Sequence, residues 1–239
     1  MKYPNTALTK VTPSACSVVK LASCMALAAG VALLSACGGL LPKAPPAPTQ
    51  LSLDMGENLS SPSGTTAIAP SQRNANQASS KTLVVEAMRS DAGYDTRDIA
   101  YRRVPGQLEY FAQHQWVDTP ARMLAPLMVK ALESKAAFRA IVVAPSTAVG
   151  QLRLETTLVR LEQDFSQVPS RARLTLRAVV IDTASRQALA TRTWDVRVDA
   201  TRDDPSHGAL AASQATQTVL SQLADFCGET ASIQAEKKP

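Results

Sequence analysis

Apolar and polar residues alternate along three stretches in the second half of the chain, with the two-residue period of a strand that buries one face. Leu152, Leu154 and Leu158 begin this pattern, which slips by one position toward Leu161 and so predicts a β-bulge. The inward positions expected in the next two stretches are Ala172, Leu174, Leu176, Ala178, Val180, Trp194, Val196 and Val198. Together the three stretches predict an antiparallel meander with one apolar face.

Shorter extended segments precede this meander and are bounded by turn-forming residues. The predicted strands are 50–53, 82–86, 98–103, 107–115 and a buried strand at 140–143. They supply further strands for the same sheet.

A first amphipathic helix is predicted after Asp118. Thr119 has the residue type of an N-cap, and Pro120 suits the first helical position. An interior proline removes a hydrogen bond, so Pro126 leaves open whether this helix bends or begins near Leu124.

A second helix is expected from about Gly208 to Cys227, where apolar residues recur at helical spacing. Gly228 would be the residue that ends this helix, because glycine readily adopts a left-handed conformation. The predicted fold class is therefore α+β: a mainly antiparallel (mixed) sheet with two helices packed on one face.

The beginning of the chain has the pattern of an export signal. Three lysines and no acidic residue accompany an apolar run at 21–34, shorter than the roughly 20 residues that span a bilayer. The run ends in Leu34-Ser35-Ala36-Cys37, which resembles the lipobox of bacterial lipoprotein signal peptides. This predicts cleavage before Cys37 and attachment of diacylglycerol and an acyl chain such as palmitate to it. The alternative is an ordinary signal anchor with an incidental cysteine.

The predicted domain organisation follows from this lipidation site. A lipoprotein signal peptide at 1–36 precedes the lipidated cysteine and a proline-rich tether at 37–48. The folded domain is expected at 49–228, with a disordered insertion at 54–80, followed by a flexible tail at 229–239. The residue after the cysteine is not the aspartate that usually retains such lipoproteins in the inner membrane. We therefore expect a lipid anchor in the outer membrane, on its periplasmic face.

Charge and cysteine content argue against a nucleic-acid-binding protein and against a domain held together by disulfides. The chain has a net charge of +5, and removing the three lysines of the predicted signal lowers it to +2, which does not favour nucleic-acid binding. Cys16 and Cys24 belong to the predicted signal and Cys37 carries lipid, so only Cys227 remains and no intramolecular disulfide can form. Cys227 is expected to pack at the end of the last helix, and the alternative is a free thiol or an intermolecular bridge.

Residues that could perform catalysis are scarce. The two histidines, His114 and His207, have no ligand residues at metal-binding spacing, and no nucleophile-elbow, phosphate-loop or dinucleotide motif occurs. The sequence predicts a protein that is not an enzyme and has no metal site and no cofactor apart from the covalent lipid.

Seven arginines lie on the strands of the predicted meander, and most of them are expected to project from its polar side. They are Arg153, Arg160, Arg171, Arg173, Arg177, Arg192 and Arg197. One interpretation is a solvated face whose arginines pair with carboxylates on neighbouring strands, and the other is a contact with an acidic partner or anionic head groups. The candidate partner interface consists of Tyr101, Trp116, Arg171, Arg173 and Arg177.

Several stretches resemble the ABC-type transport auxiliary lipoproteins, the PqiC-like family. They are YDTRDIAY (94–101), QLEYFA (107–112), WVDTPARMLAPL (116–127), FRAIV (138–142), SRARLTLRA (170–178) and LADFC (223–227). The resemblance implies a partner role beside inner-membrane ABC transporter subunits and an MCE-domain substrate-binding protein that moves lipid across the envelope. It thereby implies a part in membrane integrity. The competing hypothesis is a structural or assembly lipoprotein that binds peptidoglycan or an outer-membrane barrel. The oligomeric state is left open, a homo-oligomer included.

Overall fold

The computed structural model describes residues 46–54 and 79–236. The chain divides into two units, Met1–Pro46 and Ala47–Pro239, and the second contains every element described below. The predicted signal, Cys37 and most of the tether and of the predicted insertion lie outside the described residues, as do 237–239.

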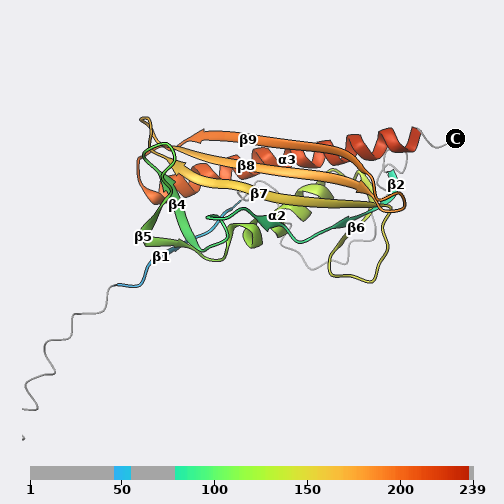
Figure 1. The fold of residues 1–239 in the computed structure, drawn as a ribbon, viewed down its shortest axis with the longest axis horizontal. Helices are drawn as coiled ribbons and strands as arrows, with labels where there is room; N and C mark the ends of the chain where they lie inside the picture. Colours follow the sequence, from blue (N-terminus) through green and yellow to red (C-terminus); the bar gives the residue numbers. More distant parts are fainter. Residues whose placement is uncertain (1–45, 55–78, 237–239) are drawn as a thin grey trace, which may run out of the picture. The chain divides into compact units, whose positions relative to one another are not determined.

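The described part of the chain forms a nine-stranded mixed sheet and two helices, which confirms the predicted α+β class (Figure 1). In chain order the elements are β1 (Thr49–Leu51), β2 (Ser79–Val85), β3 (Arg89–Ser90), β4 (Asp98–Arg102), β5 (Glu109–Trp116), α2 (Pro120–Ser134), β6 (Phe138–Val143), β7 (Leu152–Asp164), β8 (Arg171–Asp182), β9 (Ala188–Asp199) and α3 (Pro205–Glu236).

β7 is the strand around which the sheet is arranged. On one side it pairs antiparallel with β8, which pairs antiparallel with β9, as the predicted meander requires. On its other side three short strands follow one another along β7, each parallel to it: β2, then β3, then β4. β6 extends the sheet beyond β2, and β5 and β1 extend it beyond β4. The short parallel strands explain why the sheet is mixed although its longest pairings are antiparallel.

The predicted bulge is present in β7, where the register with β8 shifts between Leu158 and Arg160. Its consequence is a change of face, because one extra residue reverses the alternation of all later side chains. Leu161 therefore enters the core at 2% exposure, and the charged Glu162 turns to the opposite face.

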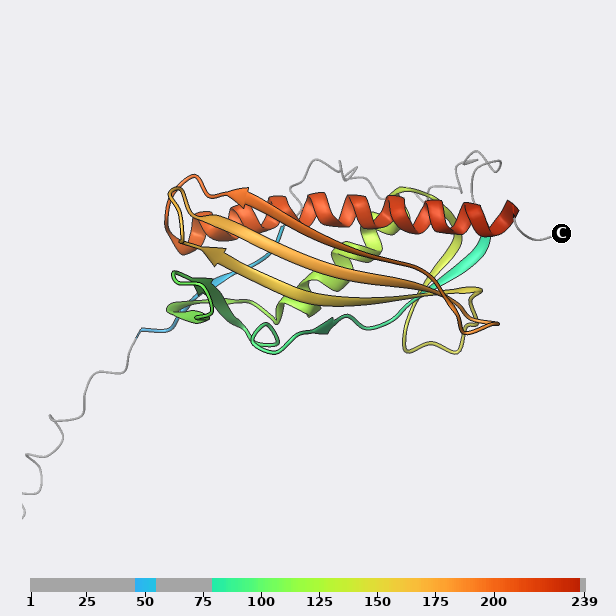
Figure 2. The ribbon, with the colours of Figure 1, turned by 45° about the horizontal axis from the view of Figure 1, so that its top comes forward.

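Both helices pack on the apolar face of the sheet (Figure 2). α3 lies against β8 and β9, and α2 contacts α3, β3, β6 and β7. Fully buried leucines such as Leu154, Leu176 and Leu223 fill the space between the layers. Burying each such side chain stabilises the fold by about 1.5–3 kcal/mol.

α2 begins at Pro120, as predicted, and continues through Pro126, which settles the alternative of a start near Leu124. Two other details of the predicted elements are corrected by the structure. β6 is an edge strand whose residues are mostly exposed or half-buried, so the expectation of a buried strand at 140–143 is wrong. α3 begins at Pro205 and runs to Glu236, past the predicted end at Cys227, so most of the predicted tail is helical.

Gly228 has a packing role instead of ending the helix. A Cβ atom at this position would lie 3.1 Å from the Cβ of Ala137, which precedes β6. The missing side chain thus lets α3 approach the connection between α2 and β6. Beyond Gly228 the helix still buries Thr230 and Ala231, which explains why it continues.

Candidate functional site

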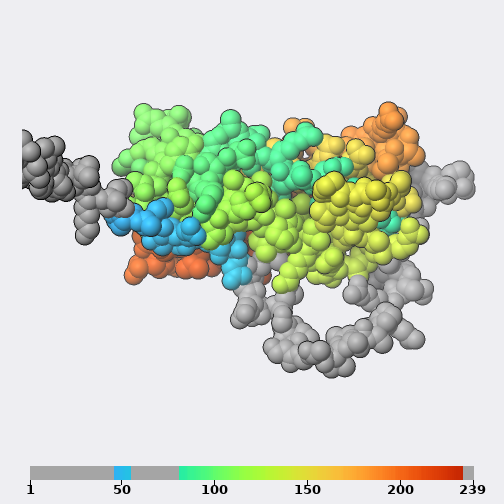
Figure 3. Space-filling view, turned by 90° about the horizontal axis from the view of Figure 1, so that it is seen from below, coloured from blue at the N-terminus to red at the C-terminus, as the bar shows by residue number. Residues whose placement is uncertain are grey.

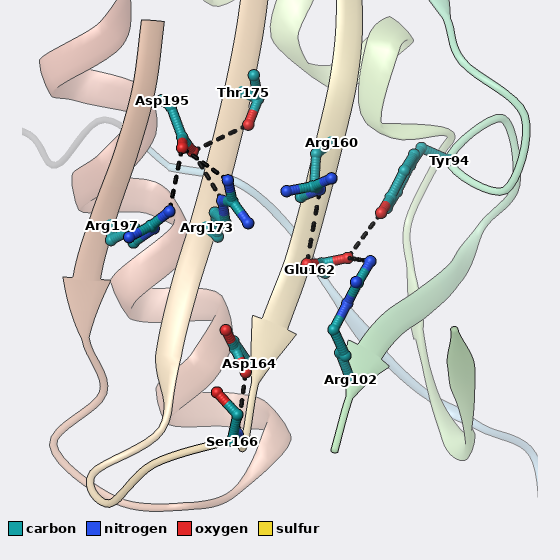
Figure 4. Close-up of polar contacts among 10 residues, drawn as sticks. All are labelled: Tyr94, Arg102, Arg160, Glu162, Asp164, Ser166, Arg173, Thr175, Asp195 and Arg197. Atoms are coloured by element: carbon teal, nitrogen blue, oxygen red, sulfur yellow. Dashed lines mark hydrogen bonds and ion pairs between the residues drawn. The ribbon is translucent and has the colours of Figure 1, made fainter. Parts of the chain in front are cut away.

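The face of the sheet opposite the helices carries most of the predicted arginines, and the structure pairs most of these with carboxylates (Figure 4). Arg192 lies instead on the side of the helices, with its guanidinium over the ring of Phe226 in α3. Arg173 on β8 donates two hydrogen bonds to Asp195 on β9, from Nε and Nη2 at 2.8 and 2.7 Å. The hydroxyl of Thr175 donates to the same carboxylate at 3.0 Å, and Arg197 lies 3.3 Å away. We call Arg173, Thr175, Asp195 and Arg197 the open network.

In the open network, hydrogen bonding between Arg173 and Asp195 favours the charged form of both side chains. Hydrogen bonding from Arg173 is the main reason that the pKa of Asp195 falls to about 2, and it also raises the pKa of Arg173. The Asp195 side chain is 34% exposed, so water screens these interactions. This supports the interpretation of a solvated face with internal partners for these arginines.

A second network surrounds Glu162 on the same face, where its side chain is fully buried. Tyr94 donates a hydrogen bond to Oε2 of Glu162 at 2.6 Å, and Nη2 of Arg102 donates to the same atom at 3.2 Å. Nε of Arg160 lies 3.6 Å from Oε1. We call Tyr94, Arg102, Arg160 and Glu162 the covered network, because the side chains of Tyr94 and Arg102 reach Glu162 from the segment beside β7 and its carboxylate is fully buried (Figure 4).

Burial dominates the electrostatics of the covered network. Burial and the hydrogen bond to Glu162 raise the pKa of Tyr94 to about 12. Burial works against the charge of Arg102, but attraction to Glu162 outweighs it and raises the pKa of the guanidinium. A carboxylate removed from water needs such partners, so the covered network is a structural tie between β7 and the segment around β4.

The other predicted interface arginines differ in their pairing. Arg171 forms an ion pair with Asp199, with Nε and Oδ1 2.6 Å apart. Arg177 is exposed and has no ion pair within the described residues. Of the three predicted interface arginines on β8, Arg177 is therefore the one whose charge is available to a partner.

Tyr101 belongs to a half-buried aromatic cluster on β4, opposite Gln163 of β7. Its ring centroid lies 4.4 Å from that of Phe111 and 5.9 Å from that of Phe165. Its hydroxyl donates a hydrogen bond to Glu109 at 2.9 Å, which is the main reason that the pKa of Tyr101 is raised. Arg103 packs over the ring and also pairs with Glu109.

Trp116 lies in the core and not on the predicted interface. Trp116 is 3% exposed. Its backbone N–H donates a hydrogen bond to the carbonyl of Arg97, and Nε of Arg97 donates one to the carbonyl of Trp116. Trp116 is the last residue of β5, and its ring packs in the hydrophobic core. The ring is therefore not available for contact with a partner.

A groove that the sequence did not indicate lies between α2 and the ends of β2 and β6. It is open to solvent and has a volume of about 570 Å³. Figure 3 shows the face on which segment 86–90 (teal), α2 (lime) and segment 143–150 (yellow) lie next to one another. The helical spacing of Ala121, Ala125 and Val129 is the signal that could have revealed it, because these small residues, of which Ala121 is buried and the other two half-buried, form a second stripe on α2.

The remaining chemistry is sparse in the described part of the chain. No group of three or more His, Cys, Asp or Glu residues within 46–54 and 79–236 could hold a metal ion. Cys227 is fully buried, and this burial raises the pKa of its thiol to about 12. The structure thus places Cys227 as a protonated, packed side chain in the C-terminal half of α3.

None of the described helices is long and apolar enough to cross a membrane.

A mixed sheet covered by two helices on one face, with paired charges on the other, defines a small α+β domain. The family model for the ABC-type transport auxiliary lipoprotein component matches residues 58–224. The chain therefore belongs to the family of ABC-type transport auxiliary lipoproteins, which are held at a membrane by lipid and associate with an ABC transporter.

Solved structures show the same fold. Protein XCC0632 from Xanthomonas campestris is similar with a TM-score of 0.61 and 23% identity, covering 66% of this chain and 90% of that one. An uncharacterized protein is similar with a TM-score of 0.56 and 11% identity, covering 76% and 99%. No curated protein matches the chain.

Proposed function

We propose that the protein is a non-catalytic lipoprotein of the outer membrane that faces the periplasm and serves an ABC/MCE-type system that transports lipid. In this role it would receive or dock an MCE-domain substrate-binding protein, whose ABC transporter lies in the inner membrane. Movement of lipid between the two membranes would then maintain membrane integrity. The observation that carries the proposal is family membership over residues 58–224, joined to the lipobox-like sequence at Cys37.

The domain organisation that we propose follows the sequence. Residues 1–36 are removed as a signal peptide, Cys37 carries the lipid, and the proline-rich residues 37–48 hold the domain away from the bilayer. Several acyl chains on one cysteine give stable anchoring where one would not.

The charged groups of the domain support a non-catalytic role. The carboxylates of Glu162 and Asp195 are each engaged by arginines, so these side chains stabilise the sheet. The proposed partner surface keeps Arg177 and the exposed part of Tyr101, together with the neighbouring Arg171 and Arg173. Trp116 is left out because it is buried.

The test is chemical crosslinking of intact envelopes followed by purification of the native lipoprotein. We expect to recover an MCE-domain protein and ABC transporter subunits. Two control variants are Cys37→Ala, which prevents lipidation, and Gly38→Asp, which keeps the lipid but introduces the residue of inner-membrane retention. Both variants should reduce recovery of the MCE-domain protein.

Recovery of peptidoglycan or an outer-membrane barrel without transporter subunits would refute this function. It would support instead the structural or assembly role that the sequence left open.

A further inference from the structure

The groove beside α2 has an aliphatic lining of the kind that suits a hydrocarbon chain. Its floor and walls include Val85, Met88, Ala125, Val129 and Val143, and none of its lining residues is aromatic. Its volume of about 570 Å³ falls within the range of roughly 300–1,000 Å³ that holds small ligands. Methionine adapts its shape to different apolar ligands, as a site for flexible chains requires.

The rim of the groove carries one available positive charge and one available negative charge. Arg122 is paired with Asp118 at 3.2 Å, and Glu86 is paired with Arg153 at 3.2 Å. Lys130 and Glu133 also line the groove, are exposed, and form no ion pair with each other or with any other described residue. The rim therefore complements a ligand that has both an anionic and a cationic group.

We propose that this groove holds one acyl chain of a zwitterionic phospholipid. The chain occupies the aliphatic lining, the phosphate pairs with Lys130, and the head-group ammonium pairs with Glu133. The inference rests on the proposed function in lipid transport and deepens it, because it gives the domain a lipid-holding site of its own.

The chemistry of the lining favours a lipid over a protein partner. Protein contacts draw most of their affinity from buried tryptophan, tyrosine and arginine side chains that fit into pockets on both partners. This groove offers short aliphatic walls and no aromatic anchor. A purely anionic head group would also leave Glu133 beside a like charge, which a zwitterionic head group avoids.

Site-specific photocrosslinking of the full-length lipoprotein in intact envelopes tests this proposal. A benzophenone amino acid replaces Pro126, which is exposed in the groove, and cells are grown with radioactive phosphate to label their phospholipids. The matched control places the same amino acid at Leu210, a residue of α3 that is 61% exposed and does not line the groove. Irradiation then reports which molecule touches each position.

We expect phospholipid on the Pro126 variant at roughly tenfold the level on the Leu210 variant, the ratio expected for one well-formed charge-assisted contact. The mass of the crosslinked peptide should correspond to a phospholipid with an amine in its head group. Adding Lys130→Glu should remove most of this label. Adding Arg186→Glu, the same charge reversal in the exposed turn between β8 and β9 and away from the groove, should leave it unchanged.

Equal label at Pro126 and Leu210 would show mere proximity to the membrane and would overturn the proposal. So would the absence of lipid at Pro126, or a crosslink there to another protein, a second copy or another segment of this chain. Purification of the MCE-domain partner from the same envelopes separates the two proposals. If the MCE-domain protein is recovered but Pro126 carries no lipid label, only the proposal of a lipid site in the groove is refuted. If Pro126 is labelled but the MCE-domain protein is not recovered, only the proposed role in transport is refuted.

Discussion

The covered network and the open network lie side by side on one face of the sheet and use the same chemistry. Glu162 and Arg173 are even direct neighbours across β7 and β8. They differ in the exposure of their carboxylates. The Glu162 side chain, bonded to Tyr94 and Arg102, is fully buried, whereas the Asp195 side chain is 34% exposed. The comparison teaches that an arginine–carboxylate pair specifies the structure where the chain covers it, and contributes little where water reaches it.

The largest effect is expected from Glu162→Ala. This substitution leaves Arg102 and Arg160 without their carboxylate and Tyr94 without its acceptor. Breaking a buried ion pair on one side should lower the free energy of unfolding by about 3–5 kcal/mol. Urea denaturation of the unit Ala47–Pro239, expressed without the preceding residues, measures this loss. A loss below 1 kcal/mol would mean that the covered network is no more important than the open one.

Tyr94→Phe should have the next largest effect, because it removes only the hydrogen bond to Glu162. A hydrogen bond to a charged group contributes about 1.5–3 kcal/mol, so a loss within that range is expected. The ring remains available for packing, which makes this substitution a specific probe of the hydroxyl.

The pH dependence of the same residue provides a second measurement. Folding raises the pKa of Tyr94 from its ordinary value near 10 to about 12, so the unfolded chain loses this proton first. The stability that Tyr94 contributes is thus fully present below pH 10 and is lost as pH rises toward 12. Unfolding measured between pH 9 and 12 should show this decline in the native sequence, and Tyr94→Phe should reduce it. An identical decline in both proteins would contradict the account.

Asp195→Asn should cost about 0–1 kcal/mol, since exposed ion pairs contribute no more than this. The sign of its pH dependence is opposite to that of Tyr94. Folding lowers the pKa of Asp195 to about 2, so its contribution is present above pH 4 and is lost as pH falls toward 2. The free energy of unfolding of the native sequence and of Asp195→Asn at low pH should therefore differ only slightly. A loss of stability as large as that of Glu162→Ala would contradict the distinction between the two networks.

Arg177→Ala should have the smallest effect on stability, within about 0.5 kcal/mol, because it removes an exposed side chain without an ion pair. It should nevertheless weaken recovery of the MCE-domain protein after crosslinking if β8 faces the partner. Arg171→Ala is the matched control, because the charge that it removes is already paired with Asp199. Equal recovery with both variants would exclude Arg177 from the partner surface.

The sequence was sufficient to predict the meander, the bulge and the two helices, because alternation and helical spacing depend on local residues. The slip between Leu158 and Leu161 even located the register shift. The end of α3 was not predictable in this way, because Gly228 is a strong local signal for a helix end. In the structure the missing side chain of Gly228 instead leaves room for Ala137, and this contact involves a segment that is distant in the sequence.

The same limit applies to the candidate sites. Glu162 has the sequence pattern of a solvated strand residue, and only the fold shows that Tyr94 and Arg102 cover it. Trp116 was predicted to belong to the partner interface, and the position of β5 places it in the core. The stripe of Ala121, Ala125 and Val129 on α2 is a local signal, but that it lines a groove depends on the positions of β2 and β6, which are distant in the sequence.

The measurement that tests the central claim most directly is the distribution of phospholipid between the two membranes after deletion of this protein. The account predicts that deletion disturbs this distribution and makes the outer membrane more permeable, and that the native chain restores both. The Cys37→Ala variant, which cannot carry the lipid, should not restore them. An unchanged lipid distribution after deletion, or full restoration by Cys37→Ala, would contradict the role of a lipid-anchored component of a lipid transport system.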